Sequence, residues 1–168
     1  MFDFAIDTED RSTFYAELAD AADALTAGES DAIANMANVS ALIWQLVPRL
    51  NWAGFYRLVG PNSGNDSNGE LVLGPFQGKA ACIRIPLGKG VCGTAAAEHA
   101  TQLVDDVHSF AGHIACDAES RAELVVPVVT NGRLVAVLDL DSPEPGRFDA
   151  EDATGIERLV ARIADRLG

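Results

Sequence analysis

Residues 122–140 read AELVVPVVTNGRLVAVLDL, two apolar runs on either side of Asn131-Gly132. Both runs are rich in β-branched residues, which favour strands. Asn-Gly is the dipeptide that two-residue hairpin turns prefer, because both of its residues tolerate a positive φ. The stretch therefore predicts an antiparallel hairpin with strands at 122–130 and 133–140.

The regions around this hairpin predict further strands on its N-terminal side and helices at both ends of the chain. Strands are expected at 52–59, 70–76, 80–85 and 102–104, with the polar residues 60–69 as a solvated hairpin tip. Helices are expected after the capping residues Ser12 and Ser30, ending near Gly28 and Pro48, and over 149–167.

Together these elements predict the α+β fold class, with a central antiparallel sheet and flanking amphipathic helices in a single domain over residues 1–168. The N-terminal helices are expected to cover about 12–47, the sheet and its functional loops about 51–141, and the C-terminal helix about 149–167.

The composition narrows the possible functions. The chain of 168 residues has a formal net charge of -13 and only two lysines, so approach to nucleic acid or to an anionic membrane would be repulsive. The sequence has neither a signal-peptide pattern nor an apolar run long enough to span a bilayer, which predicts a cytoplasmic location. In that reducing compartment the three cysteines are expected to be catalytic or buried thiols rather than a disulfide framework.

Cys92 lies in Gly88-Lys89-Gly90-Val91-Cys92-Gly93-Thr94, just before the helix-forming run 95–98. A thiol near a helix N-terminus and three residues from the ammonium group of Lys89 is expected to favour its thiolate. The alternative is a glycine-rich turn that holds an inert small residue. A phosphate cradle is disfavoured, because the spacing matches neither the dinucleotide nor the Walker pattern.

The other two cysteines have less distinctive surroundings. Cys116 lies in residues 113–120, HIACDAES, whose lack of periodicity predicts an irregular loop that could display a reactive group. A structural metal held by His113, Cys116 and either Cys92 or His99 is the competing interpretation, but no zinc spacing supports it and no metal site is predicted. Cys82 falls on the predicted strand 80–85, where packing is the favoured role, although it could also assist Cys92.

Three carboxylates accompany the hairpin. Asp139 and Asp141 are two residues apart, so they face the same side of an extended strand and one should have a raised pKa. Such a pair could donate a proton and bind an ammonium group, or it could be a solvated strand end. A two-residue turn would pair Glu123 with Leu140 and place it on the opposite face, whereas a three-residue turn with a bulge would bring it opposite Asp139 or Asp141.

Two aromatic residues share one face of the first predicted strand. Trp52 and Tyr56 flank Gly54 with the period of two that places all three side chains on one side. Core packing is the default explanation of this pattern. The same geometry would also form an aromatic slot for a small apolar or sulfonium-like group.

With these residues in view, the sequence resembles the free methionine-(R)-sulfoxide reductases, small enzymes built on a GAF domain. The resemblance covers most of the chain and is densest in five motifs, which are NWAGFY at 51–56, LGPFQGK at 73–79, GKGVCGT at 88–94, GHIACD at 112–117 and VLDLDS at 137–142. It also favours the bulged hairpin. The polar residues 62–68 look longer than the family usually has.

The resemblance implies a role for each candidate residue. Cys116 would attack the sulfoxide, Cys92 would resolve the resulting sulfenic acid as a disulfide, and Cys82 could assist. Trp52 and Tyr56 would form the walls of the pocket, and the carboxylates Glu123, Asp139 and Asp141 would bind and protonate the substrate.

The implied reaction reduces free L-methionine-(R)-sulfoxide to methionine, without a cofactor, and thioredoxin would then reduce the disulfide. A homodimer would suit a GAF domain flanked by amphipathic helices. The rival interpretation is a GAF module without catalysis, which binds a small ligand or senses redox state.

Overall fold

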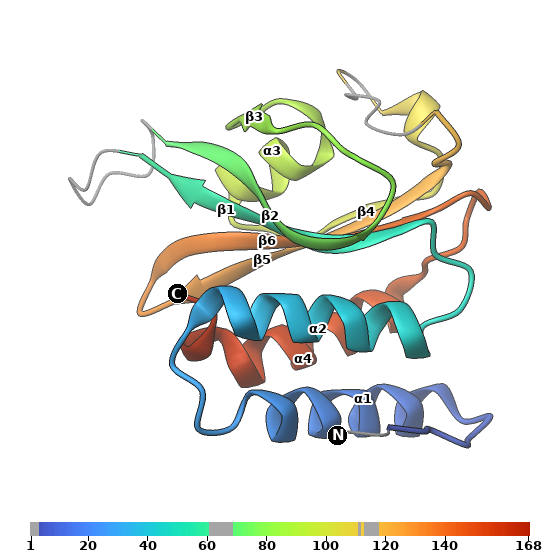
Figure 1. Cartoon of the computed structure of the whole chain (residues 1–168). Helices are drawn as coiled ribbons and strands as arrows, with labels where there is room; N and C mark the ends of the chain where they lie inside the picture. The colour runs from blue at the N-terminus through green and yellow to red at the C-terminus, as the bar shows by residue number, and fades with distance from the viewer. Residues whose placement is uncertain (1–3, 61–68, 111, 113–117) are drawn as a thin grey trace.

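The computed structural model describes residues 4–60, 69–110, 112 and 118–168, and it contains one antiparallel sheet between two helical layers (Figure 1). The six strands of the described chain lie in the order β3-β2-β1-β6-β5-β4. They are β1 (Trp52–Val59), β2 (Glu70–Gly78), β3 (Arg84–Pro86), β4 (Gln102–Val104), β5 (Ala122–Thr130) and β6 (Arg133–Ser142). The predicted α+β class is confirmed.

Helices cover both faces of this sheet. The helices are α1 (Arg11–Thr26), α2 (Ala32–Leu46), α3 (Gly90–Glu98) and α4 (Ala150–Ile163), with 3-10 turns at η2 (Val107–Ser109) and η3 (Ala164–Arg166). Figure 1 shows α1, α2 and α4 on one side of the sheet and α3 with β3 on the other. No helix among the described residues is both long and apolar enough to cross a membrane.

The two N-terminal helices begin at aspartates rather than at the predicted serines. Asp10 accepts a hydrogen bond from the backbone N–H of Thr13 at 2.8 Å, and Asp31 accepts one from Ala34 at the same distance. Ser12 is already inside the first turn of α1, and Ser30 precedes the cap of α2. A carboxylate at this position satisfies a free N–H group and also interacts favourably with the helix dipole.

The sheet separates two apolar cores. One fills the space between the sheet and the layer of α1, α2 and α4, and the other lies under α3. Alternation along β6 places Leu138 and Leu140 in the first core, and therefore directs Asp139 to the face that α3 covers. Trp52 and Tyr56 on β1 belong to the second core, so the candidate carboxylate and both aromatics share that face.

The hairpin of β5 and β6 carries the predicted bulge. Its turn residues Asn131 and Gly132 have φ of 50° and 76°, as a two-residue turn requires. The register then shifts between Val128 and Val129, which leaves one extra residue in β6. As a result Glu123 pairs with Asp141 and stands on the same face. The predicted bulge and the position of Glu123 are confirmed, but the turn has two residues rather than the three expected with a bulge.

The predicted strand at 80–85 is wrong for most of its length, because only Arg84–Pro86 pairs with β2. Two carbonyls of the preceding segment accept hydrogen bonds from side chains instead. Trp52 Nε1 donates to the carbonyl of Lys79 at 3.1 Å, and Tyr56 Oη donates to that of Cys82 at 3.0 Å. Cys82 is consequently half-buried beside the second core rather than packed inside it.

Candidate active site

Three reactive side chains converge between α3 and the sheet. Cys92 comes from the first turn of α3, Glu123 from β5 and Asp139 from β6, and one ligand atom from each lies within 4.8 Å of the other two. The thiol of Cys92 donates a hydrogen bond to Glu123 Oε1, with 3.9 Å between sulfur and oxygen. All three residues are buried, with exposed fractions of 4%, 6% and 5%. This arrangement joins two of the predicted site carboxylates to one of the predicted cysteines.

Burial controls the protonation of this cluster. It raises the pKa of Asp139 to about 7, a shift that the hydrogen bond from Cys92 partly opposes. The pKa of Glu123 lies well above its usual range because of burial and because Asp139 and Asp141 repel its charge. The raised carboxyl pKa that the sequence predicts for this pair of aspartates is thus found at Asp139, with burial rather than repulsion by Asp141 as its cause. A proton shared by Glu123 and Asp139 near neutral pH is consistent with these shifts.

Cys92 does not have the thiolate character predicted from its sequence neighbours. Burial is the largest cause of a pKa well above the usual value of a thiol, and repulsion by Asp139 and Glu123 adds to it. Lys89 precedes α3 on an exposed part of the chain. The carboxylates near Cys92 in space therefore outweigh the ammonium group near it in sequence.

The glycines around Cys92 have backbone roles. Gly88 and Gly90 have φ of 75° and 63°, values that favour glycine. A Cβ atom on Gly93 would lie 2.4 Å from the carbonyl oxygen of Pro86. These residues allow α3 to start close against β3, which explains the motif without a phosphate.

A stack of three aromatic rings forms the wall beside the carboxylates. Trp52 stacks on Tyr56 with 5.7 Å between ring centroids and on Phe76 of β2 with 5.2 Å. A cavity of about 10 Å³ lies here, with room for roughly one water. It is lined by Trp52, Tyr56, Lys79, Ala80, Ala81, Asp139 and Asp141. An amino acid can enter only when these walls separate.

Phe76 is the site residue that the sequence analysis missed. Its signal was Gly54, because a Cβ atom on Gly54 would lie 2.3 Å from Phe76 Cβ and 2.8 Å from the Trp52 ring. The space over Gly54 is therefore filled by the backbone and Cβ of Phe76 from the neighbouring strand and by the Trp52 ring. The aromatic pattern at 52–56 is both core packing and a pocket wall.

We expect Gly54→Ala to separate this aromatic stack and to lower the stability of the protein by about 1 to 3 kcal/mol, the usual cost of overpacking. The added methyl group meets backbone and Cβ atoms of Phe76, which cannot rotate away. Chemical denaturation and tryptophan fluorescence would measure the effect. Gly146→Ala would tell less about packing than Gly54→Ala does, because a Cβ atom built on Gly146 has no other atom within 4 Å. Unchanged fluorescence and stability in Gly54→Ala would contradict the described packing.

The remaining predicted residues are placed only in part. Asp141 lies beside the cavity and opposite Glu123, whereas the thiol of Cys82 is outside the cluster of Cys92, Glu123 and Asp139. Cys116 and His113 lie outside the described residues, so the role of Cys116 and its disulfide with Cys92 stay predictions. His99 caps the end of α3 and is exposed, which separates it from any metal site with Cys92.

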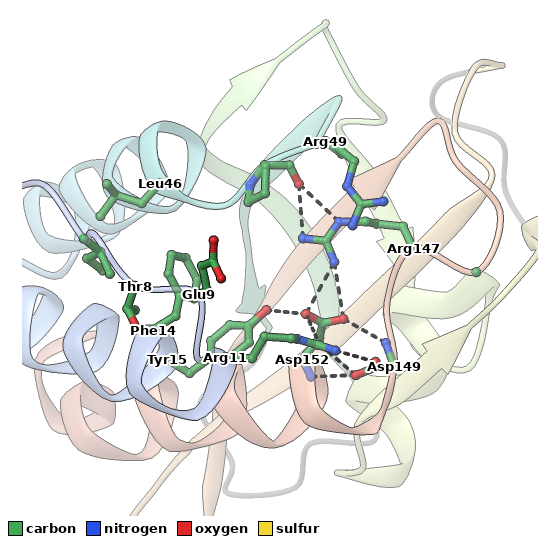
Figure 2. A pocket seen from close by; sticks show the side chains of 13 residues that line it. Thr8, Glu9, Arg11, Phe14, Tyr15, Leu46, Arg49, Arg147, Asp149 and Asp152 are labelled. Carbon is green, nitrogen blue, oxygen red and sulfur yellow. Dashed lines mark hydrogen bonds and ion pairs between the residues drawn. The ribbon is translucent and has the colours of Figure 1, made fainter.

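A larger cavity of about 530 Å³ lies elsewhere, between the N-terminal segment, α1 and the start of α4 (Figure 2). Four of its charged residues form ion pairs among themselves, namely Arg11, Arg147, Asp149 and Asp152. Asp152 is buried, accepts a hydrogen bond from Tyr15 and forms ion pairs with Arg11 at 2.9 Å and Arg147 at 3.3 Å. No cysteine or histidine of the described chain lines it. The smaller cavity, although tight, is the one that adjoins reactive groups.

Comparison with known proteins agrees with this geometry. The family model "GAF domain" matches residues 34–167, so the chain belongs to the GAF-domain family. A free methionine-R-sulfoxide reductase of Escherichia coli is 49% identical over 91% of this chain and 88% of its own length. One of Saccharomyces cerevisiae is 44% identical over 83% and 77%. The structure of a free methionine-R-sulfoxide reductase from Neisseria meningitidis with its substrate has a TM-score of 0.89 and 40% identity, covering 99% of this chain and 96% of that one.

Within the GAF-domain proteins, the chain therefore belongs to the family of the free methionine-R-sulfoxide reductases. The fold and family that the sequence motifs indicated are confirmed.

Proposed function

We propose that this protein reduces free L-methionine-(R)-sulfoxide to methionine. The observation that carries the proposal is the buried cluster of Cys92, Glu123 and Asp139 beside an aromatic wall. Relatives of this chain are named free methionine-R-sulfoxide reductases. A sulfoxide needs a proton donor at its oxygen, an apolar wall for its methyl and methylene groups, and thiols as a source of electrons. The site has carboxyl groups that could donate the proton, an aromatic wall, and Cys92 as one of the thiols.

The first half-reaction reduces the substrate and oxidises the protein. The thiol sulfur of Cys116 attacks the sulfoxide sulfur while a protonated carboxyl, Asp139 or Glu123, donates to the sulfoxide oxygen. A bond forms between the two sulfurs, and the sulfoxide oxygen leaves as water with the donated proton and the proton of the thiol. A water molecule then attacks the sulfur of Cys116 and releases a proton to solvent, the bond between the sulfurs breaks, methionine is released, and Cys116 becomes a sulfenic acid. Asp139 suits the donor role because burial raises its pKa to about 7, so a proton is available near neutral pH.

Cys92 then resolves the sulfenic acid. Its sulfur displaces the hydroxyl group of oxidised Cys116, which forms a disulfide, and the leaving hydroxide takes a proton from solvent to become water. The thiol proton must leave during this step, and Glu123 Oε1 already accepts a hydrogen bond from it. The carboxyl pair that gave a proton to the sulfoxide can thus recover one from Cys92. A high pKa protects Cys92 from reacting before Cys116 is oxidised.

The external steps follow from thiol chemistry. A dithiol protein such as thioredoxin reduces the disulfide by exchange and is itself oxidised to a disulfide. Asp141, at the edge of the cavity, is the candidate partner for the substrate's ammonium group. Enclosure of the substrate's amino and carboxylate groups in a closed pocket would exclude a methionine inside a peptide chain. A cytoplasmic location, which the sequence pattern predicts, and a homodimer, which the resemblance suggests, remain parts of this proposal.

The deciding experiment incubates the protein with each epimer of free methionine sulfoxide and dithiothreitol, and measures methionine by chromatography. We expect reduction of the R epimer alone. A second assay with thioredoxin, thioredoxin reductase and NADPH tests the reductant. Failure to reduce the R epimer would favour the rival GAF module that binds a ligand without turnover. Equal reduction of the S epimer would contradict the assignment to an R-specific reductase.

The carboxyl pair also predicts how stability depends on pH. The pKa of Asp139 rises from 3.8 to about 7 on folding, so the folded state binds more protons than the unfolded state between these values. The free energy of unfolding should therefore fall, as far as Asp139 contributes, when the pH rises from about 4 to about 7. Asp139 is faced by Cys92 and Glu123, and Asp141 adds further negative charge.

Denaturation of the parent and of Asp139→Asn across this range would measure the contribution. The asparagine variant should gain stability relative to the parent as the pH rises, because it has no carboxylate to ionise. A difference between the two proteins that does not change with pH would show that Asp139 is ionised in the folded state throughout.

A further inference from the structure

The cluster of Cys92, Glu123 and Asp139 has the composition and spacing of a metal site. Each residue comes from a different element, α3, β5 or β6, and each contributes one soft or hard donor atom within 4.8 Å of the others. Packed helix and sheet hold all three in place, since none is more than 6% exposed. A site of this kind does not have to be assembled from mobile surface groups.

A second observation points to a missing ligand. Asp139 Oδ1 is buried and has no hydrogen-bond partner among the described residues. An acceptor buried without a partner is unfavourable, and the usual remedies are a proton, an ordered water or a cation. Asp139 also lines the small cavity, so the unpaired carboxylate lies where a small ion could reach it.

The donor set identifies the class of ion. One thiolate sulfur with two carboxylate oxygens suits a borderline divalent ion such as Zn²⁺, which accepts both kinds of ligand. Mg²⁺ and Ca²⁺ prefer oxygen ligands alone. Three protein ligands leave one position of a tetrahedron open, and the adjoining cavity has room for about one water.

We propose that reduced Cys92, Glu123 and Asp139 bind one Zn²⁺ ion, and that the ion shuts down the reductase. On binding, the S–H bond of Cys92 and the O–H bond of the protonated carboxyl break, one sulfur–zinc and two oxygen–zinc bonds form, and both protons pass to solvent. The ion occupies the carboxylates that would protonate the substrate and the thiol that would resolve the sulfenic acid. The binding itself goes beyond the proposed function, because it requires no sulfoxide and no turnover.

Binding is tested on the full chain, reduced with a phosphine that contains no thiol, with Co²⁺ as the spectroscopic probe and Zn²⁺ as its competitor. We expect one Co²⁺ per chain, a thiolate-to-cobalt charge-transfer band, and visible bands of tetrahedral intensity that Zn²⁺ removes. Cys92→Ser should lose the charge-transfer band. Asp139→Asn and Glu123→Gln should each weaken Zn²⁺ binding by at least about tenfold.

Two controls separate this site from general attraction of cations to an acidic protein. Cys82→Ser removes a thiol outside the cluster and should retain the band. Glu144→Gln removes one exposed charge, which pairs with Arg49, and should leave Zn²⁺ affinity within about twofold. Thermal melts by circular dichroism establish that each variant is folded.

Absence of the band in the parent protein would overturn the proposal. So would a band that survives in Cys92→Ser, or a Zn²⁺ affinity that does not respond to Asp139→Asn and Glu123→Gln. None of these readouts uses methionine sulfoxide. The metal-binding proposal can therefore be disproved while the proposed reductase activity is confirmed, and the reductase activity can be disproved while metal binding is confirmed. Inhibition is then measured separately. One equivalent of Zn²⁺ should abolish turnover of methionine sulfoxide, and a chelator should restore it.

Discussion

Replacement of Cys116 by serine is expected to abolish methionine production with any reductant. A serine hydroxyl cannot reduce the sulfoxide, because the oxygen atom cannot be oxidised as a thiol sulfur can. Cys92 cannot take over the attack, since it is buried, protonated and surrounded by acidic groups. Measured turnover of the R epimer should fall to the rate of the reductant alone.

Cys92→Ser should behave differently from Cys116→Ser. It should release about one methionine per chain and then stop when thioredoxin is the reductant, because no thiol is left to form the disulfide. Cys82→Ser is the matched control and should keep cycling, since its thiol is outside the cluster. If Cys92→Ser cycles with thioredoxin as fast as the parent, the resolving thiol is another cysteine, and Cys82 is the first to examine.

The second large effect is expected at the carboxyl pair. Asp139→Asn or Glu123→Gln should lower kcat/KM for the R epimer by on the order of a hundredfold or more, in line with loss of a general acid. Both substitutions preserve shape, and both remove a group whose charged form is unfavourable in the folded state. The fold should therefore survive, as circular dichroism would show.

Glu144→Gln provides the comparison for this pair, because Glu144 is an exposed carboxylate that forms an ion pair with Arg49. Its kcat/KM should remain within about twofold of the parent. Rates for both Asp139→Asn and Glu123→Gln that match those of Glu144→Gln would mean that the proton comes from another group.

The elements that the sequence predicted well are those whose signal is local. The hairpin turn at Asn131-Gly132 needs positive φ at two adjacent residues, and the strands on either side alternate with the period of a sheet. The bulge in β6 has no such local signal, and only the family resemblance indicated it. The strand predicted at 80–85 failed because side chains of Trp52 and Tyr56, distant in sequence, occupy carbonyls of that segment.

The chemistry of Cys92 shows a similar limit. Its sequence neighbours include a lysine and a helix N-terminus, which both favour a thiolate. Its neighbours in space are Glu123 and Asp139, from strands about thirty to fifty positions further along the chain, and they favour the thiol. Phe76 was missed for the same reason, since only the pairing of β1 with β2 places it opposite Gly54.

The paired charges drawn in Figure 2 have a consequence for where the domain begins. The family match starts at residue 34, after α1 has ended. Yet α1 supplies Tyr15 and Arg11 to the buried Asp152, and the ring of Tyr15 fills the space that Gly155 leaves on α4. A fragment cut at the family boundary would lose two of the partners of an interior carboxylate and open a hole against α4. The first helix is thus an interior part of this protein's architecture, and its removal would destabilise the helical layer on which the sheet rests.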